Sequence, residues 1–117
     1  MPTLRELTET IQRRPGVRAV VILAADGLVI EMHDAGHDNA DALAARAPAV
    51  AIAARQLGAV AGAGDAELVL LEFEQGYGVI LRLSAQAMLF VSAAPEVALG
   101  DLLFDLRRHR APMAALV

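Results

Sequence analysis

The segment that decides the fold is residues 15–30, PGVRAVVILAADGLVI. Two apolar, largely β-branched runs lie on either side of the Asp26-Gly27 pair. This pair is typical of a tight hairpin, because both central positions of a type I′ turn require a positive φ. The segment therefore predicts two antiparallel strands, at about 17–25 and 28–33.

A helix is predicted before this hairpin. Thr3 and Glu6 have the spacing of a capping box, in which each side chain accepts a hydrogen bond from the other residue's backbone. Apolar residues follow at helical spacing until Pro15-Gly16 stops the pattern. The helix is expected at about 3–13.

A second, longer helix is expected after the hairpin, at about 39–61, with Asp38 or Asn39 as its cap. It is apolar on nearly every side, which is typical of a helix buried on more than one face. Its own sheet would cover one face and a second subunit the other. Pro48 should kink or break this helix, so a break near Ala47 is the alternative to one continuous helix. Its apolar stripe contains Leu43, Ala47, Val50, Ala54 and Leu57.

The remaining pattern predicts three more strands and a last helix. We expect the strands at 66–74, 77–83 and 87–92 and the helix at about 96–110, where Pro112 closes it. The order α-β-β-α-β-β-β-α predicts an α+β fold with an antiparallel sheet made of hairpins. We expect one domain over residues 1–117, with an ordered core at about 3–110.

Composition excludes several kinds of chemistry. The 117 residues include no Cys and no Lys, so all ten basic residues are Arg. These absences exclude a disulfide framework, a thiolate metal site, a lysine Schiff base and a phosphate-binding P-loop. No catalytic constellation and no cofactor site is found, so we expect a protein that is not an enzyme.

Charge and hydropathy limit the binding partners and the cellular location that we expect. A net charge of −4 and an aromatic content of 3% lack the footprint of nucleic-acid binding. The longest uncharged run, residues 83–95, is too short to span a membrane. Arg5, Glu6 and Glu9 leave no room for a signal-peptide core at the N-terminus. We expect a cytoplasmic protein that binds no nucleic acid and inserts into no membrane.

Two small motifs have competing interpretations. His33 and His37, with the aspartates beside them, form the most metal-like cluster, but no third His lies nearby and no acid is placed as in H-E-x-x-H. A solvated loop that ends in a helix cap also explains the segment. The glycines 58, 62 and 64 follow a helix and precede a strand. A phosphate-binding loop has the opposite order, so a helix end and a turn explain them better.

The hairpin of residues 15–30 resembles the first hairpin of the roadblock family, which includes dynein light chains and bacterial GTPase regulators. The resemblance continues through the Ala-rich second helix, Gly76-Tyr77, the strand 87–91 and Leu99-Gly100. It covers about residues 3–110.

The resemblance implies a five-stranded sheet with the long helix on one face and the two terminal helices on the other. It also implies a homodimer in which the second helices meet and the third strands pair. Leu68 and Leu70 of that strand then join the helix stripe at the dimer interface.

The family relationship implies regulation of a small Ras-like GTPase, which is activated or recruited by the dimer without an inserted catalytic residue. Arg46, Arg55 and Gln56 are the candidate docking residues on the second helix. The alternatives are a pure assembly scaffold and a small-ligand sensor. A sensor requires a sizeable pocket lined by Val, Leu and Met, against which the Ala-rich packing argues.

Overall fold

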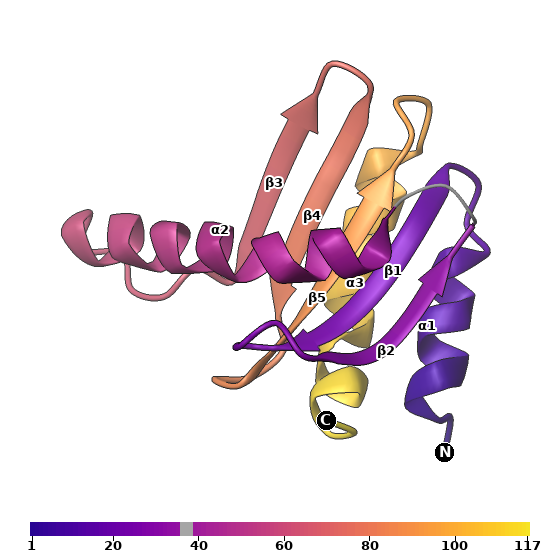
Figure 1. The fold of residues 1–117 in the computed structure, drawn as a ribbon, viewed down its shortest axis with the longest axis horizontal. Coiled ribbons are helices and arrows are strands. Elements are labelled where there is room, and N and C mark those ends of the chain that lie inside the picture. Colours follow the sequence, from indigo (N-terminus) through magenta and orange to yellow (C-terminus); the bar gives the residue numbers. More distant parts are fainter. Residues whose placement is uncertain (36–38) are drawn as a thin grey trace.

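The computed structural model describes residues 1–35 and 39–117. Their strands form one five-stranded antiparallel sheet in the order β2-β1-β5-β4-β3, so β2 and β3 are its edges (Figure 1). The predicted α-β-β-α-β-β-β-α order and the α+β class are confirmed. The elements are α1 (Leu4–Gln12), β1 (Val17–Ala24), β2 (Val29–Asp34), α2 (Ala40–Val60), β3 (Leu68–Phe73), β4 (Gly76–Arg82), β5 (Ala87–Ala93) and α3 (Leu99–Ala114).

The sheet is covered on both faces, as expected. On one face α1 and α3 contribute Leu7, Ile11, Leu102 and Leu106 to the larger cluster of buried side chains. On the other face α2 contributes only the alanines 40, 44 and 47 to the smaller cluster. Figure 1 shows α2 in front of the sheet and the other two helices behind it. The alternation of strand side chains between the two faces supplies both clusters.

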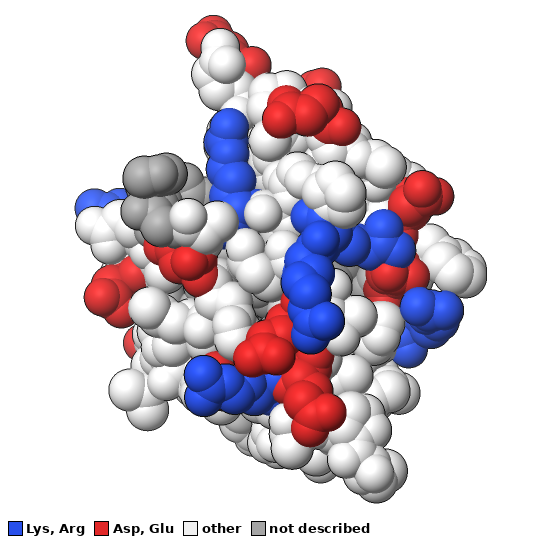
Figure 2. Space-filling view, turned by 90° about the vertical axis from the view of Figure 1, so that its right-hand side faces the viewer, with Lys and Arg blue, Asp and Glu red and all other residues white. Residues whose placement is uncertain are grey.

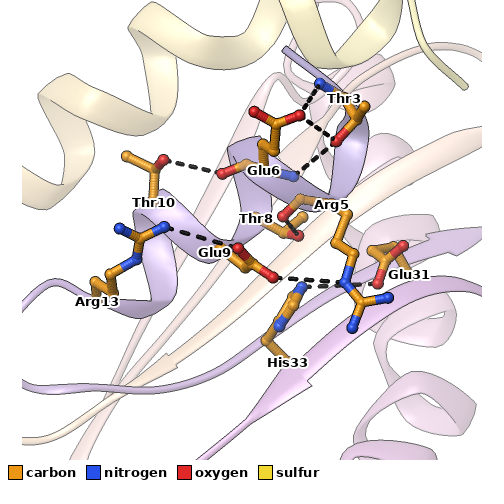
Figure 3. Close-up of polar contacts among 9 residues, drawn as sticks. All are labelled: Thr3, Arg5, Glu6, Thr8, Glu9, Thr10, Arg13, Glu31 and His33. Atoms are coloured by element: carbon orange, nitrogen blue, oxygen red, sulfur yellow. Dashed lines mark hydrogen bonds and ion pairs between the residues drawn. The ribbon is translucent and has the colours of Figure 1, made fainter.

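Helix α1 begins at the predicted capping box. The Thr3 hydroxyl accepts from the backbone N–H of Glu6 at 3.1 Å, and the Glu6 carboxylate accepts from the backbone N–H of Thr3 at 3.3 Å (Figure 3). Glu9 forms ion pairs with Arg5 and Arg13, one turn away on each side. The capping box satisfies two backbone amides at the start of the helix.

The turn between β1 and β2 differs from the prediction. The Gly27 N–H donates to the carbonyl of Ala24 at 2.9 Å, and the Ala24 N–H donates to the carbonyl of Leu28 at 2.8 Å. Gly27 has a φ of +93°, whereas Asp26 keeps a negative φ. The loop therefore has three residues instead of two. A single left-handed glycine is enough to close it, and the predicted type I′ turn was wrong.

The two internal prolines do not end their helices. Helix α2 is continuous over 21 residues with Pro48 inside it, so the alternative break near Ala47 is not formed. Helix α3 begins at Leu99 and continues past Pro112, so the predicted bounds of 96–110 were wrong at both ends. Met113 is fully buried in the core below α3, and this burial outweighs the single backbone donor that Pro112 lacks.

Helix α2 ends in a Schellman motif. The Gly62 N–H donates to the carbonyl of Ala59 at 3.1 Å, and the Ala63 N–H donates to the carbonyl of Gly58 at 2.8 Å. Gly62 has a φ of +68°, which suits the residue after a helix. The helix-end interpretation of the three glycines is therefore correct. No helix in the described part of the chain is long and apolar enough to cross a bilayer.

Candidate interaction surface

Strand β3 is an apolar edge strand. Its neighbour on one side is β4, and no described strand pairs with its other side. Leu70 is 43% exposed and Phe73 is 56% exposed, although both belong to a strand whose sequence is LVLLEF. An edge with unpaired backbone groups and exposed apolar side chains is a template for pairing with another chain.

The C-terminal end of α2 extends beyond the sheet (Figure 1). In Figure 1 the helix crosses the sheet and continues beyond β3. All of its buried residues lie in the first half, whereas Leu57 is 71% exposed and Val60 is 88% exposed. Helix α2 and β3 thus expose apolar surface at the same edge of the molecule, which is the arrangement of an interface without its partner.

The predicted dimer residues lie in different environments. Ala47 is buried against the protein's own sheet, and Leu43 and Val50 are half-buried against the same cluster. Leu68 is half-buried against the cluster below α1 and α3. Of the remaining three, Leu57 and Leu70 are exposed and Ala54 is half-buried. Leu43, Val50 and Leu57 are spaced by seven residues and share one flank of α2.

The two flanks of α2 border different cavities. On the flank of Leu43, Arg46 and Phe73 line an open hollow of about 610 Å³. On the opposite flank, Ile52 and Arg55 line a smaller cavity of about 140 Å³. Arg46 and Arg55 are nine residues apart, or two and a half turns, so they lie on opposite flanks. Gln56 is exposed, and the three predicted docking residues therefore do not form one cluster within a protomer.

A chain of charges joins α2, the start of β3 and α3. Arg55 lies 3.9 Å from Asp65, which lies 3.8 Å from Arg82. Arg82 is also 3.8 Å from Glu67, which forms a closer ion pair with Arg110. The longer pairs are exposed ion pairs beyond hydrogen-bond distance and stabilise the fold little.

The strongest internal ion pair was not predicted. Arg14, just after α1, donates to Asp105 of α3, whose side chain is only 12% exposed. This hydrogen bond and the nearby guanidinium of Arg108 hold the pKa of Asp105 below its usual range, although burial opposes them. The two residues are 91 positions apart, and no local pattern connects them.

Only one of the two candidate metal ligands, His33, belongs to the described residues. His33 lies 3.6 Å from Glu31 on β2 (Figure 3), and its Nε2 has no hydrogen-bond partner among the described residues. His37 lies outside the described residues. Within residues 1–35 and 39–117, no three His, Asp or Glu side chains are placed to hold a metal ion.

The side of the molecule formed by α1 and β2 carries charges of both signs. Figure 2 shows arginine and acidic side chains interleaved on this side, with uncharged surface between them. The pairs of Glu9 with Arg5 and Arg13 belong to it. The edge at β3 differs in exposing two large apolar side chains, Leu70 and Phe73, beside its carboxylates.

Sequence and structure comparisons agree on one family. The Roadblock/LC7 domain matches residues 3–93. No curated protein is similar enough to count as a match.

Several solved structures have the same fold. A Roadblock/LC7 domain from Streptomyces avermitilis is 25% identical, with a TM-score of 0.86 over 97% of each chain. Myxococcus xanthus MglB is 11% identical, with a TM-score of 0.87 over 97% of this chain and 93% of that one. An MglB with a tetrameric arrangement is 19% identical, with a TM-score of 0.87 over 95% of this chain and 85% of that one.

Proposed function

This chain belongs to the Roadblock/LC7 domain family, and we propose that it is a homodimeric interaction module that binds and regulates a small Ras-like GTPase. It acts as one unit over residues 1–117 in the cytoplasm. The observation that carries the proposal is the joint exposure of apolar surface on the edge strand β3 and on the end of α2 beyond it.

The dimer is a continuous sheet in which β3 pairs antiparallel with its copy. Helix α2 crosses β3 near Leu68 and Val69, which border the smaller cavity, and not near its other end at Phe73. A two-fold axis between the paired strands therefore brings the partner's α2 to the Phe73 end, beside the Leu43 flank. The partner helix then covers the 610 Å³ hollow and buries Leu57 of both copies.

Self-association has support from outside this chain. One structural relative, an MglB, is described in a tetrameric arrangement. The interface proposed here consists of the flank with Leu43, Val50, Ala54 and Leu57, together with Leu70 of β3. Ala47 contributes by letting α2 approach its own sheet closely, because alanine is small and fully buried there.

The GTPase binds the outward surface of the two α2 helices. The side chains of Arg46 and Gln56 are exposed there and are offered twice by the symmetric dimer, while Arg55 lies on the outer flank. Arginine suits this role, because its guanidinium makes planar, charge-assisted contacts with carboxylates and phosphates. The module supplies a docking surface, and the GTPase supplies the nucleotide chemistry.

The test mixes the protein with a Ras-like GTPase from the same organism and measures both complex formation and GTP hydrolysis. We expect binding to the wild type and to Arg13→Ala, a substitution on the opposite side of the sheet. Arg46→Ala with Gln56→Ala should weaken binding while the solution mass stays dimeric. GTPase regulation is contradicted if the protein binds neither the GTP-bound nor the GDP-bound form of the GTPase. Binding without a change in the rate of GTP hydrolysis favours a scaffold.

A further inference from the structure

The smaller cavity beside α2 has an apolar interior. It lies between the middle of α2 and the sheet, where Ile80 of β4 and Met88 of β5 form its floor and Ile52 of α2 forms a wall. Its volume of about 140 Å³ is close to that of a cavity that holds a benzene ring. The helix packs on its own sheet through alanines, and it leaves this space where no long side chain fills it.

The mouth of the cavity is positively charged. Arg55, Arg82 and Glu67 line it, and the carboxylate of Asp65 lies beside the two arginines. Arg110 forms a close ion pair with Glu67. Three guanidiniums and two carboxylates leave one positive charge in excess.

The two arginines at the mouth can take a further partner. Within the described residues, the guanidiniums of Arg55 and Arg82 make no side-chain hydrogen bond, and their ion pairs are 3.8 Å or longer. Each guanidinium has five N–H donors in a fixed planar arrangement that matches a carboxylate. A single negative charge placed at the mouth would be neutralised there.

We propose that this cavity binds a small monocarboxylate with an apolar body of about six carbon atoms. The body fills the space between Ile52, Ile80 and Met88, and the carboxylate accepts hydrogen bonds from Arg55 and Arg82. A ligand with a second negative charge is disfavoured, because Asp65 and Glu67 repel the excess. Met88 is flexible and adapts the floor to the shape of the ligand.

This site is independent of the proposed dimer, and it shares Arg55 with the proposed GTPase-docking residues. The cavity opens on the Ile52 flank of α2, which is opposite to the Leu57 flank assigned to the dimer. A monomeric solution mass would overturn the dimer and leave the cavity available. A dimer without ligand binding would do the reverse, so the two outcomes are distinguishable.

Benzoate is the probe, and its binding is followed by the backbone amide resonances of the full chain. We expect saturable shifts at residues around the cavity, with a Kd of about 1 mM for a ligand of this size. Benzyl alcohol and benzylamine have the same ring without the negative charge, and acetate has the charge without the ring. All three should bind at least about tenfold more weakly.

Two matched arginine variants separate the site from general charge effects. Arg55→Leu should weaken benzoate binding about tenfold, because a charge-assisted hydrogen bond is lost. Arg46→Leu removes an exposed arginine from the other flank of the same helix and should leave binding unchanged. The proposal is overturned if benzoate causes no saturable shift, or if acetate or benzyl alcohol binds as tightly as benzoate. It is also overturned if Arg55→Leu and Arg46→Leu change the benzoate Kd equally.

Discussion

Replacing Leu57 by Ala should weaken the homodimer without unfolding the protomer. Leu57 is 71% exposed in the isolated chain, so this part of its surface becomes buried only when the two helices meet in the dimer. Full burial of a leucine side chain is worth about 2 kcal/mol, so this fraction corresponds to about 1.5 kcal/mol per copy. The symmetric dimer contains the residue twice, and the loss is about 3 kcal/mol or a hundredfold in the dimer Kd.

Sedimentation equilibrium over a dilution series measures this Kd directly. The matched control is Ile52→Ala, because Ile52 is 51% exposed on the opposite flank of the same helix and should leave the dimer Kd unchanged. Circular dichroism of both variants should match the wild type, since neither side chain is buried in the protomer. The reasoning is refuted if Leu57→Ala dissociates like the wild type, or if both variants weaken the dimer equally.

Two further substitutions test the fold, and a third serves as a control. Asp105→Asn leaves Arg14 without its carboxylate and should lower the free energy of unfolding by about 2 kcal/mol in urea. Because the pKa of Asp105 is lowered in the fold, its stabilisation is present above the unfolded pKa of about 4 and is lost as pH falls through the folded pKa. The variant should therefore lose less stability than the wild type on acidification, and an equal acid slope would contradict this assignment. Gly62→Ala should cost about 1 kcal/mol in thermal unfolding, because Gly62 has a φ of +68°. Gly100 lies in a helix with open space around it, so Gly100→Ala should be neutral or stabilising.

Local patterns predicted the elements but not all of their ends. The apolar run of β1 and the capping box at Thr3 are complete within a few neighbouring residues, and the structure confirms both. The end of α3 depends on Met113, whose burial is decided by what lies across the core. Sequence reasoning stopped the helix before Pro112 because it weighed the missing backbone donor and could not weigh that burial.

Distant contacts and empty space were the features that no pattern showed. The pair of Arg14 and Asp105 joins residues 91 positions apart. The cavity below Ile52 was also unexpected, because a helix rich in alanine predicts close packing. The alanines do bring the first half of α2 onto the sheet, but a cavity remains between the middle of the helix and the sheet near β3.

The overhang of α2 has a consequence for local stability. Amides in its first half are protected by the buried alanines below them, whereas those around Leu57 and Val60 rely on the backbone hydrogen bonds of an unsupported helix. Hydrogen exchange in the second half therefore proceeds by local fraying in a lone protomer. Any partner that covers this half slows its hydrogen exchange. Binding of a partner and ordering of this end of the helix are therefore linked in one equilibrium.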